Sequence, residues 1–229
     1  MRIHSKIANW FCGLRAFAPL LGFVYRDRGA RFAEKQDYDR AIADFSACIR
    51  LRPNGDAWID RGAAYLGKGD NDAAIADFTA MIERHPVDAR AFTNRGEAFR
   101  RKGELMLAIA DLSRAIELDP KDPFPFFDRG IAYSDLGDAD RAIADYSAAI
   151  RLDPDEAPYY NNRGNAYIGN KDVEAAIADY DRAIQLDPKF ALAYYNRARL
   201  FSDRGDIDAA ERDIVAAKAI EAHIANEFT

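Results

Sequence analysis

The sequence predicts an all-α fold, a right-handed α-solenoid of six tandem helix pairs. Two observations carry this prediction: glycines and prolines recur at one period, and the apolar residues between them follow helical spacing. The glycines lie 33, 34, 34 and 34 residues apart, at Gly29, Gly62, Gly96, Gly130 and Gly164. The prolines repeat at the same spacings, at Pro53, Pro86, Pro120, Pro154 and Pro188. Such a period is typical of stacked repeats that pack only against their neighbours.

The first helix of each pair is expected to end at a glycine, because a left-handed residue commonly closes a helix. This glycine is found at Gly69, Gly103, Gly137 and Gly205. Gln36 and Lys171 replace it in repeats one and five, so those two turns are expected to be strained or differently shaped. The next residue is usually Asp, which caps the second helix and faces the positive end of its dipole.

The second helix of each pair carries apolar residues three, four and seven positions apart, which places them on one face. An alanine recurs near the start of this helix and allows the two helices to approach closely, at Ala41, Ala74, Ala108, Ala142, Ala176 and Ala210. The expected helix pairs are 23–35/38–51, 56–67/71–84, 89–102/105–118, 123–136/139–152, 157–169/173–186 and 191–203/207–221.

The solenoid is predicted to end with repeat six. Two positions of the second helix are isoleucine in repeats one to five, and in repeat six they become Glu211 and Lys218. A polar outer face is what a terminal repeat needs to stay in solution. We therefore expect the solenoid to cover residues 23–221 and a C-terminal tail to cover residues 222–229.

Residues 1–22 form an apolar, basic N-terminal segment. Their charge is +3, whereas the whole chain has −6 and the remainder therefore −9. Three interpretations stay open: a capping helix over repeat one, a secretory signal or membrane anchor, or a flexible terminus. Basic residues and an Ala16-Phe17-Ala18 site favour the signal, whereas Arg15 interrupts the apolar run of residues 7–24. We do not expect a membrane partner. If the chain does contact a membrane, residues 7–24 are the segment that would bind it.

The repeating phrase itself is specific. It reads RGAAYLGKGDNDAAIADFTAMIERHP in repeat two and RGIAYSDLGDADRAIADYSAAIRLDP in repeat four. Within repeat two, a large apolar residue, a glycine, an aromatic residue, an alanine, a second aromatic residue and a proline stand at Trp58, Gly62, Tyr65, Ala74, Phe78 and Pro86. This pattern resembles the tetratricopeptide repeat family over about residues 23–221.

Composition and motifs exclude several function classes. The net charge of −6 is spread without a basic stripe, which argues against nucleic-acid binding. The three histidines, His4, His85 and His223, stand at no metal-ligand spacing, and Cys12 and Cys48 form no disulfide framework. No nucleophile, phosphate-loop or zinc motif is present. We predict a non-catalytic protein without a cofactor or a metal.

An arginine and an aspartate recur sixteen residues apart in every repeat. The arginines are Arg28, Arg61, Arg95, Arg129, Arg163 and Arg197, and the aspartates are Asp44, Asp77, Asp111, Asp145, Asp179 and Asp213. In the resembling family the arginine position is usually leucine and lies near the helix packing. A buried arginine requires a partner, so we expect one ion pair per repeat.

The resemblance also implies a concave groove lined by the first helix of each pair. One helix position is always a short polar residue, and a row of Asn can grip a peptide backbone because Asn both donates and accepts. The residues expected to contact a peptide are Asp60, Arg90, Asn94, Arg101, Phe124, Phe127, Asp128, Ile131, Asn161, Asn162, Asn165, Tyr195 and Asn196. The alternative interpretation is that these positions belong to the framework or to ordinary solvated helix surface. Aromatic residues beside the basic spot of Arg90, Arg100 and Arg101 would suit an apolar peptide with an acidic end.

The expected function is that of a scaffold or adaptor that binds a peptide or protein partner in this groove. The family's carboxylate clamp for chaperone C-termini is absent, since its first lysine place holds Arg26, Ile59, Thr93 or Phe127. The alternative is a structural module that forms homo-oligomers through its ends or its N-terminal segment. A cytoplasmic location is expected, and the alternative is export or anchoring through residues 1–22.

Overall fold

The computed structural model describes residues 20–227, with side chains through residue 223. Most of the predicted N-terminal segment, residues 1–19, lies outside this range. The chain divides into two compact units, Met1–Leu118 and Asp119–Thr229, here called the first and the second unit. The regular secondary structure of residues 20–227 is helical and includes no strand. The predicted all-α class and its helix pairs are thereby confirmed.

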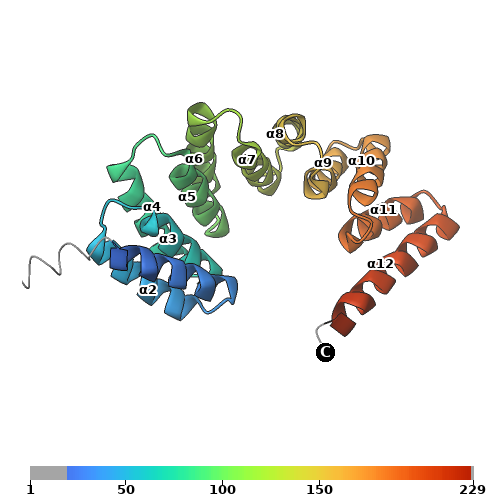
Figure 1. Ribbon diagram of the computed structural model, residues 1–229. Helices are drawn as coiled ribbons and strands as arrows, with labels where there is room; N and C mark the ends of the chain where they lie inside the picture. Colours follow the sequence, from blue (N-terminus) through green and yellow to red (C-terminus); the bar gives the residue numbers. More distant parts are fainter. Residues whose placement is uncertain (1–19, 228–229) are drawn as a thin grey trace, which may run out of the picture. The chain divides into compact units, whose positions relative to one another are not determined.

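Each unit holds three helix pairs (Figure 1). The first unit comprises a helix described over residues 20–34, then α2 (Tyr38–Leu51), α3 (Ala57–Lys68), α4 (Asn71–Arg84), α5 (Ala89–Arg101) and α6 (Leu105–Leu118). The second unit comprises α7 (Pro123–Asp135), α8 (Ala139–Leu152), α9 (Ala157–Gly169), α10 (Val173–Leu186), α11 (Ala191–Asp203) and α12 (Ile207–Glu227).

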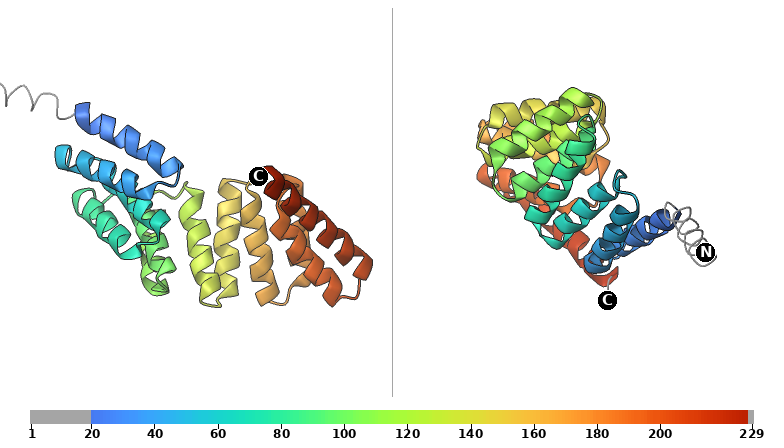
Figure 2. Two further views of the ribbon diagram at one scale, coloured as in Figure 1. Left: turned by 90° about the horizontal axis from the view of Figure 1, so that it is seen from below. Right: turned by 90° about the vertical axis from the view of Figure 1, so that its left-hand side faces the viewer.

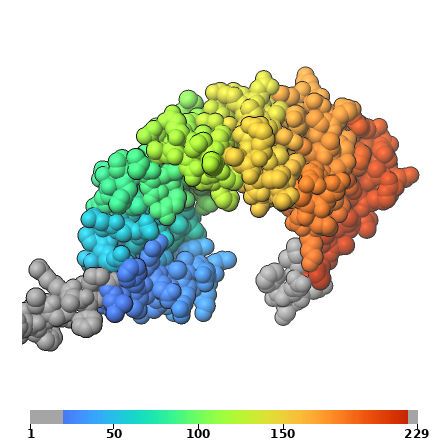
Figure 3. All heavy atoms as spheres, turned by 45° about the horizontal axis from the view of Figure 1, so that its top comes forward, coloured from blue at the N-terminus to red at the C-terminus, as the bar shows by residue number. Residues whose placement is uncertain are grey.

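Neighbouring helices stack in the order of the chain. Within the first unit α2 packs on α3 and α4 on α5, and within the second unit α8 packs on α9 and α10 on α11. The two views of Figure 2 show this stacking within each unit, and Figure 3 shows that the atoms of neighbouring repeats within each unit meet at the surface. The first helices of successive pairs also touch, α3 with α5 and α7 with α9.

The turn inside each pair takes the predicted left-handed form. Gly69, Gly103, Gly137 and Gly205 have φ values between 77° and 87°. Gln36 and Lys171 take the same conformation, with φ of 58° and 62°, so these two turns keep their shape in spite of a side chain. The following aspartates cap the second helices: the carboxylates of Asp70, Asp138 and Asp172 each accept a hydrogen bond of 3.1 Å from a backbone N–H.

We predict that Lys171→Gly stabilises the protein by about 0.5–1 kcal/mol. A residue with a β-carbon pays about 1–2 kcal/mol in the left-handed region, and part of this gain is lost to the greater freedom of glycine in the unfolded chain. The matched control is Gly137→Ala, where φ is 77° and open space surrounds the new β-carbon. Its stability in urea should fall by a comparable amount, and equal stabilities for both variants and the wild type would contradict this account.

In repeats one to five, an aromatic ring or a leucine packs against the repeated glycine. A β-carbon on Gly130 would lie 2.7 Å from the ring of Tyr146, and one on Gly164 would lie 2.7 Å from the ring of Tyr180. Tyr146 and Tyr180 are almost fully buried. Within each of these pairs, the glycine therefore lets the two helices close onto the ring.

The second helix of the last pair is longer than predicted. Glu211 and Lys218 are both exposed. Helix α12 continues to Glu227, past the predicted end at residue 221, because no proline stops it as Pro154 and Pro188 follow α8 and α10.

Candidate protein-binding surface

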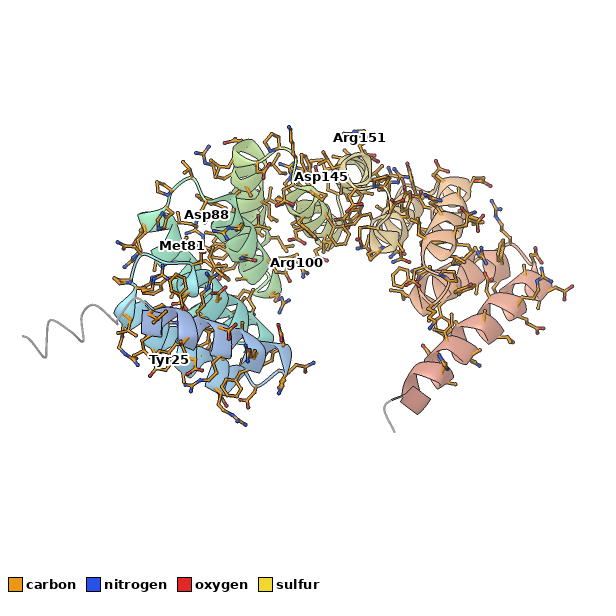
Figure 4. All side chains as sticks on the ribbon, in the orientation of Figure 1. Tyr25, Met81, Asp88, Arg100, Asp145 and Arg151 are labelled. Carbon is orange, nitrogen blue, oxygen red and sulfur yellow. The ribbon has the colours of Figure 1, made fainter. Side chains whose placement is uncertain are left out.

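The arginine–aspartate pairs form in all six repeats. In each, the guanidinium Nε and Nη2 donate to the two carboxylate oxygens over 2.6–2.9 Å. The six aspartates are buried, among them Asp145, which Figure 4 labels on α8. This two-point geometry is the strongest form of such a pair. The prediction of one ion pair per repeat is confirmed.

The inner arginines have further partners. Arg163 Nη1 donates to Ser147 of the preceding repeat over 3.0 Å, and the rings of Tyr160 and Tyr167 lie 5.7 and 5.8 Å from its guanidinium carbon. The hydrogen bond to Asp179 raises the pKa of Arg163 above its usual value. Arg61 and Arg95 repeat this arrangement with Ser46 and Thr79. These charges hold the framework together and are not offered to a ligand.

The expected basic spot on α5 is neutralised by neighbouring acids. Arg90 pairs with Asp88 at 2.7 Å and with Asp56 at 3.1 Å. Arg101 pairs with Glu97 at 2.6 Å, and Arg100 pairs with the same carboxylate. Burial alone would raise the pKa of Glu97, but the hydrogen bonds from both arginines lower it below its usual value. Asp88 and Glu97 stand within four residues of these arginines in the sequence, whereas the contact of Arg90 with Asp56 forms only when two repeats stack.

The row of short polar residues, which includes Asp60, Asn94, Asp128, Asn162 and Asn196, makes different contacts in the two units. In the first unit Asp60 binds the guanidinium of Arg26, and Asn94 is half-buried. In the second unit three amides form a chain: Asn196 donates to Asn161 over 2.9 Å, and Asn161 donates to Asn162 over 3.3 Å. Asn161 is 1% exposed, so its side chain lies beneath the surface.

The remaining residues that were predicted to contact a peptide lie in the second unit and differ in their exposure to solvent. Phe127 packs between two rings, with centroid distances of 5.7 Å to Tyr146 and 4.7 Å to Tyr159. Phe124 is 61% exposed, and Asn165 is exposed as well. Asp128, Ile131, Asn162 and Asn196 are half-buried. Tyr195 is also half-buried, and its hydroxyl donates to Glu221 of α12 over 3.0 Å.

Two residues extend the exposed apolar surface that Phe124 begins. Pro158 and Leu192 occupy the same position of α9 and α11, one and two periods after Phe124, and both are exposed, Leu192 by 51%. We call these three residues the apolar row. The repeat period would have revealed them in the sequence, had each helix position been compared across all repeats.

The repeats between residues 26 and 212 match one family. Tetratricopeptide repeat models match residues 26–78, 59–123 and 127–189, and a second model of the same description matches residues 179–212. The chain belongs to the tetratricopeptide repeat family. Membership in this family supports a role as a protein-interaction scaffold. A comparison with curated protein sequences finds no match.

Several solved structures share the fold. A MamA protein is 26% identical, with a TM-score of 0.62 over 75% of this chain and 94% of its own. A thermophilic tetratricopeptide repeat protein from Thermus thermophilus is 21% identical, with a TM-score of 0.66 over 79% and 98%. YrrB, described as a tetratricopeptide repeat protein with an unusual peptide-binding site, is 24% identical, with a TM-score of 0.58 over 74% and 88%.

The described part of this tetratricopeptide repeat chain exposes the apolar row on α7, α9 and α11. Between residues 20 and 223, no three His, Cys, Asp or Glu side chains gather as metal ligands would. Among the described helices, none combines the length and the hydropathy that crossing a bilayer requires. The apolar row and Asn165, all exposed on the first helices of the second unit, are the features that a partner could contact.

Proposed function

We propose that this chain is a non-catalytic scaffold that binds a segment of a partner protein across α7, α9 and α11. The apolar row carries this proposal. Phe124 and Leu192 are 61% and 51% exposed, and they recur at one position of successive first helices. Exposed apolar residues that form a regular line, rather than scattered single residues, are a common mark of a protein-binding site.

The spacing of the row suggests the size of the bound segment. Packed helices lie about 8–10 Å apart. Because α7 and α9 touch directly and α11 packs on α10 beside α9, the row extends over at least about 16–20 Å. An extended chain covers that distance with about five or six residues at about 3.3–3.6 Å each. The exposed amide of Asn165 lies on the central helix of the three and can hydrogen-bond to a main chain laid across it.

The engaged arginines of α5 change the chemistry expected of the partner. Because Arg90 and Arg101 already bind Asp88, Asp56 and Glu97, an acidic peptide end would have to displace these acids. We therefore expect apolar and aromatic side chains, rather than a terminal carboxylate, to supply most of the affinity.

A peptide selection on the intact protein tests this function. Peptides selected from an unbiased display library should bind Phe124→Ala/Leu192→Ala at least about tenfold more weakly, as loss of a central apolar anchor does in other interfaces. The matched control is Val215→Ala on α12, an apolar residue that is 67% exposed and lies outside the row. Helical circular dichroism should be the same for all three proteins. Binding that survives the double substitution but is lost in Val215→Ala would refute the proposal and favour the outer helices.

Self-association is the second candidate, and one observation favours it. Leu20, Leu21, Phe23 and Val24 are exposed by 46–62% on the helix of residues 20–34. An exposed apolar cluster of this kind can hold two copies together. Light scattering of the chain with and without residues 1–22 separates this candidate from the first.

A further inference from the structure

A hollow of about 150 Å³ opens in the second unit between α7, the start of α8 and α9. Its lining residues are Ser134, Gly137, Ala139, Asn165, Ala166 and Gly169. Ser134, Gly137, Asn165 and Gly169 are exposed, so the hollow is open to solvent. It lies on the two first helices, α7 and α9, that contact each other (Figure 1).

The corresponding place in the first unit is filled by the chain itself. Counting along the repeat, Tyr38 corresponds to Ala139 and Gly67 to Gly169. The ring of Tyr38 lies so close over Gly67 that a β-carbon there would overlap it. Tyr38 packs in a cluster with Ala33 and Ala64, and these residues correspond to Ser134 and Ala166 of the hollow.

The space exists because the first helix has glycine, which lacks a side chain, at the positions of Gly67 and Gly169. Only repeats two and five have glycine at this position of the first helix, and the other four repeats carry Glu34, Arg101, Asp135 and Asp203. In repeat two, the space above Gly67 holds an aromatic ring. In repeat five, the space above Gly169 is bordered by the small side chain of Ala139, whose β-carbon would lie 3.2 Å from one on Gly169.

The size and the walls of the hollow both suit an aromatic ring. An apolar cavity of about 150 Å³ is known to accept benzene. The walls add polar groups at the edge: Asn165 Oδ1 accepts from the Tyr180 hydroxyl over 2.7 Å, and Ser134 Oγ lies 3.1 Å from the Tyr146 hydroxyl. An amide and a hydroxyl at the mouth can serve a phenol as donor or acceptor.

We propose that this hollow receives an aromatic side chain of the bound partner, in the place that Tyr38 fills in the first unit. The proposal rests on the proposed function and adds a specificity element to it. A partner segment that runs from the apolar row, at the starts of α7 and α9, toward the ends of these two helices would insert one tyrosine or phenylalanine between Ser134 and Asn165. Partners that lack an aromatic residue at that point would bind more weakly.

The hollow can be tested without knowing the partner, by using p-cresol as a tyrosine side-chain analogue. In NMR titrations of the full-length protein, p-cresol should shift the amide signals of Ala139, Asn165 and Gly169. Ala139→Tyr, which copies Tyr38, should fill the hollow and weaken p-cresol binding at least tenfold. Gly169→Asp, which copies Asp135 and Asp203, should do the same and serves as a second variant if Ala139→Tyr does not fold.

The reverse substitution provides the matched control. Tyr38→Ala should create a new p-cresol site whose signals surround Gly67, while the second-unit site stays unchanged. Cyclohexylmethanol should bind the second-unit hollow more weakly than p-cresol. Shifts that persist at full size in Ala139→Tyr and Gly169→Asp, or equal binding of both probes, would overturn the proposal. If p-cresol binds as expected but no selected peptide depends on the apolar row, the hollow stands and the proposed function fails.

Discussion

Asp179→Ala should destabilise the protein by about 3–5 kcal/mol, the usual cost of removing one partner from a buried ion pair. The side chains of Arg163 and Asp179 are 19% and 8% exposed. Without the carboxylate, the guanidinium keeps the hydroxyl of Ser147 and two aromatic rings, which do not balance its charge. Urea unfolding followed by circular dichroism measures the loss.

The first repeat supplies the control for this prediction. Arg28 forms the same pair with Asp44, but its side chain is 56% exposed. Asp44→Ala leaves that guanidinium in water, so its cost should be nearer the value of about 1 kcal/mol or less that exposed pairs show. Equal losses for Asp44→Ala and Asp179→Ala would show that burial of the arginine does not set the cost.

A double substitution separates the net contribution of the ion pair to stability from the cost of leaving one buried charge without its partner. Arg163→Leu with Asp179→Leu removes both charges and keeps apolar volume. Replacing both partners of a buried pair in this way is often neutral or stabilising. We therefore expect the double variant to be clearly more stable than Asp179→Ala.

Gly164→Ala should destabilise the protein by about 1–3 kcal/mol through overpacking. The new β-carbon would lie 2.7 Å from the ring of Tyr180, which is fully buried and cannot move aside. Thermal unfolding of the variant against the wild type measures the effect.

Repeat six avoids this clash by having different residues at both positions. In repeat six the glycine position is Ala198, and the ring position sixteen residues later is Ile214. Gly164→Ala should therefore cost less when Tyr180→Ile is also present. A double-mutant cycle measures this coupling, and strictly additive losses would contradict the contact between the two positions.

The fold could be predicted because its signals are local and repeat. The arginine–aspartate pairs followed from a constant spacing, whereas the turns at Gln36 and Lys171 were expected to be strained or differently shaped and instead keep the left-handed form of the four glycines. The state of individual surface residues could not be predicted in this way. Asn161 and Asn165 are one helical turn apart, yet one is buried and the other exposed.

The charged residues of α5 show why the candidate site was harder to predict from the sequence than the fold. Arg90 pairs with Asp88, two residues earlier, and also with Asp56, which stands one repeat earlier and approaches only when the two pairs stack. A repeat pattern gives the position of a side chain on its helix, but not the rotamer that brings it to a neighbour. The same holds for Tyr38, whose ring covers Gly67 in the next repeat.

The bond from Arg163 to Ser147 has a consequence for how the protein opens. It ties the fifth helix pair to the fourth, as Arg61 and Ser46 tie the second to the first. In stacked repeats, such neighbour contacts set how far an opening spreads along the array. The exposed Arg28 leaves the first pair more weakly held than the inner ones. Amide hydrogens of α2 should therefore exchange with solvent sooner than those of α4, and fraying should proceed inward from that end.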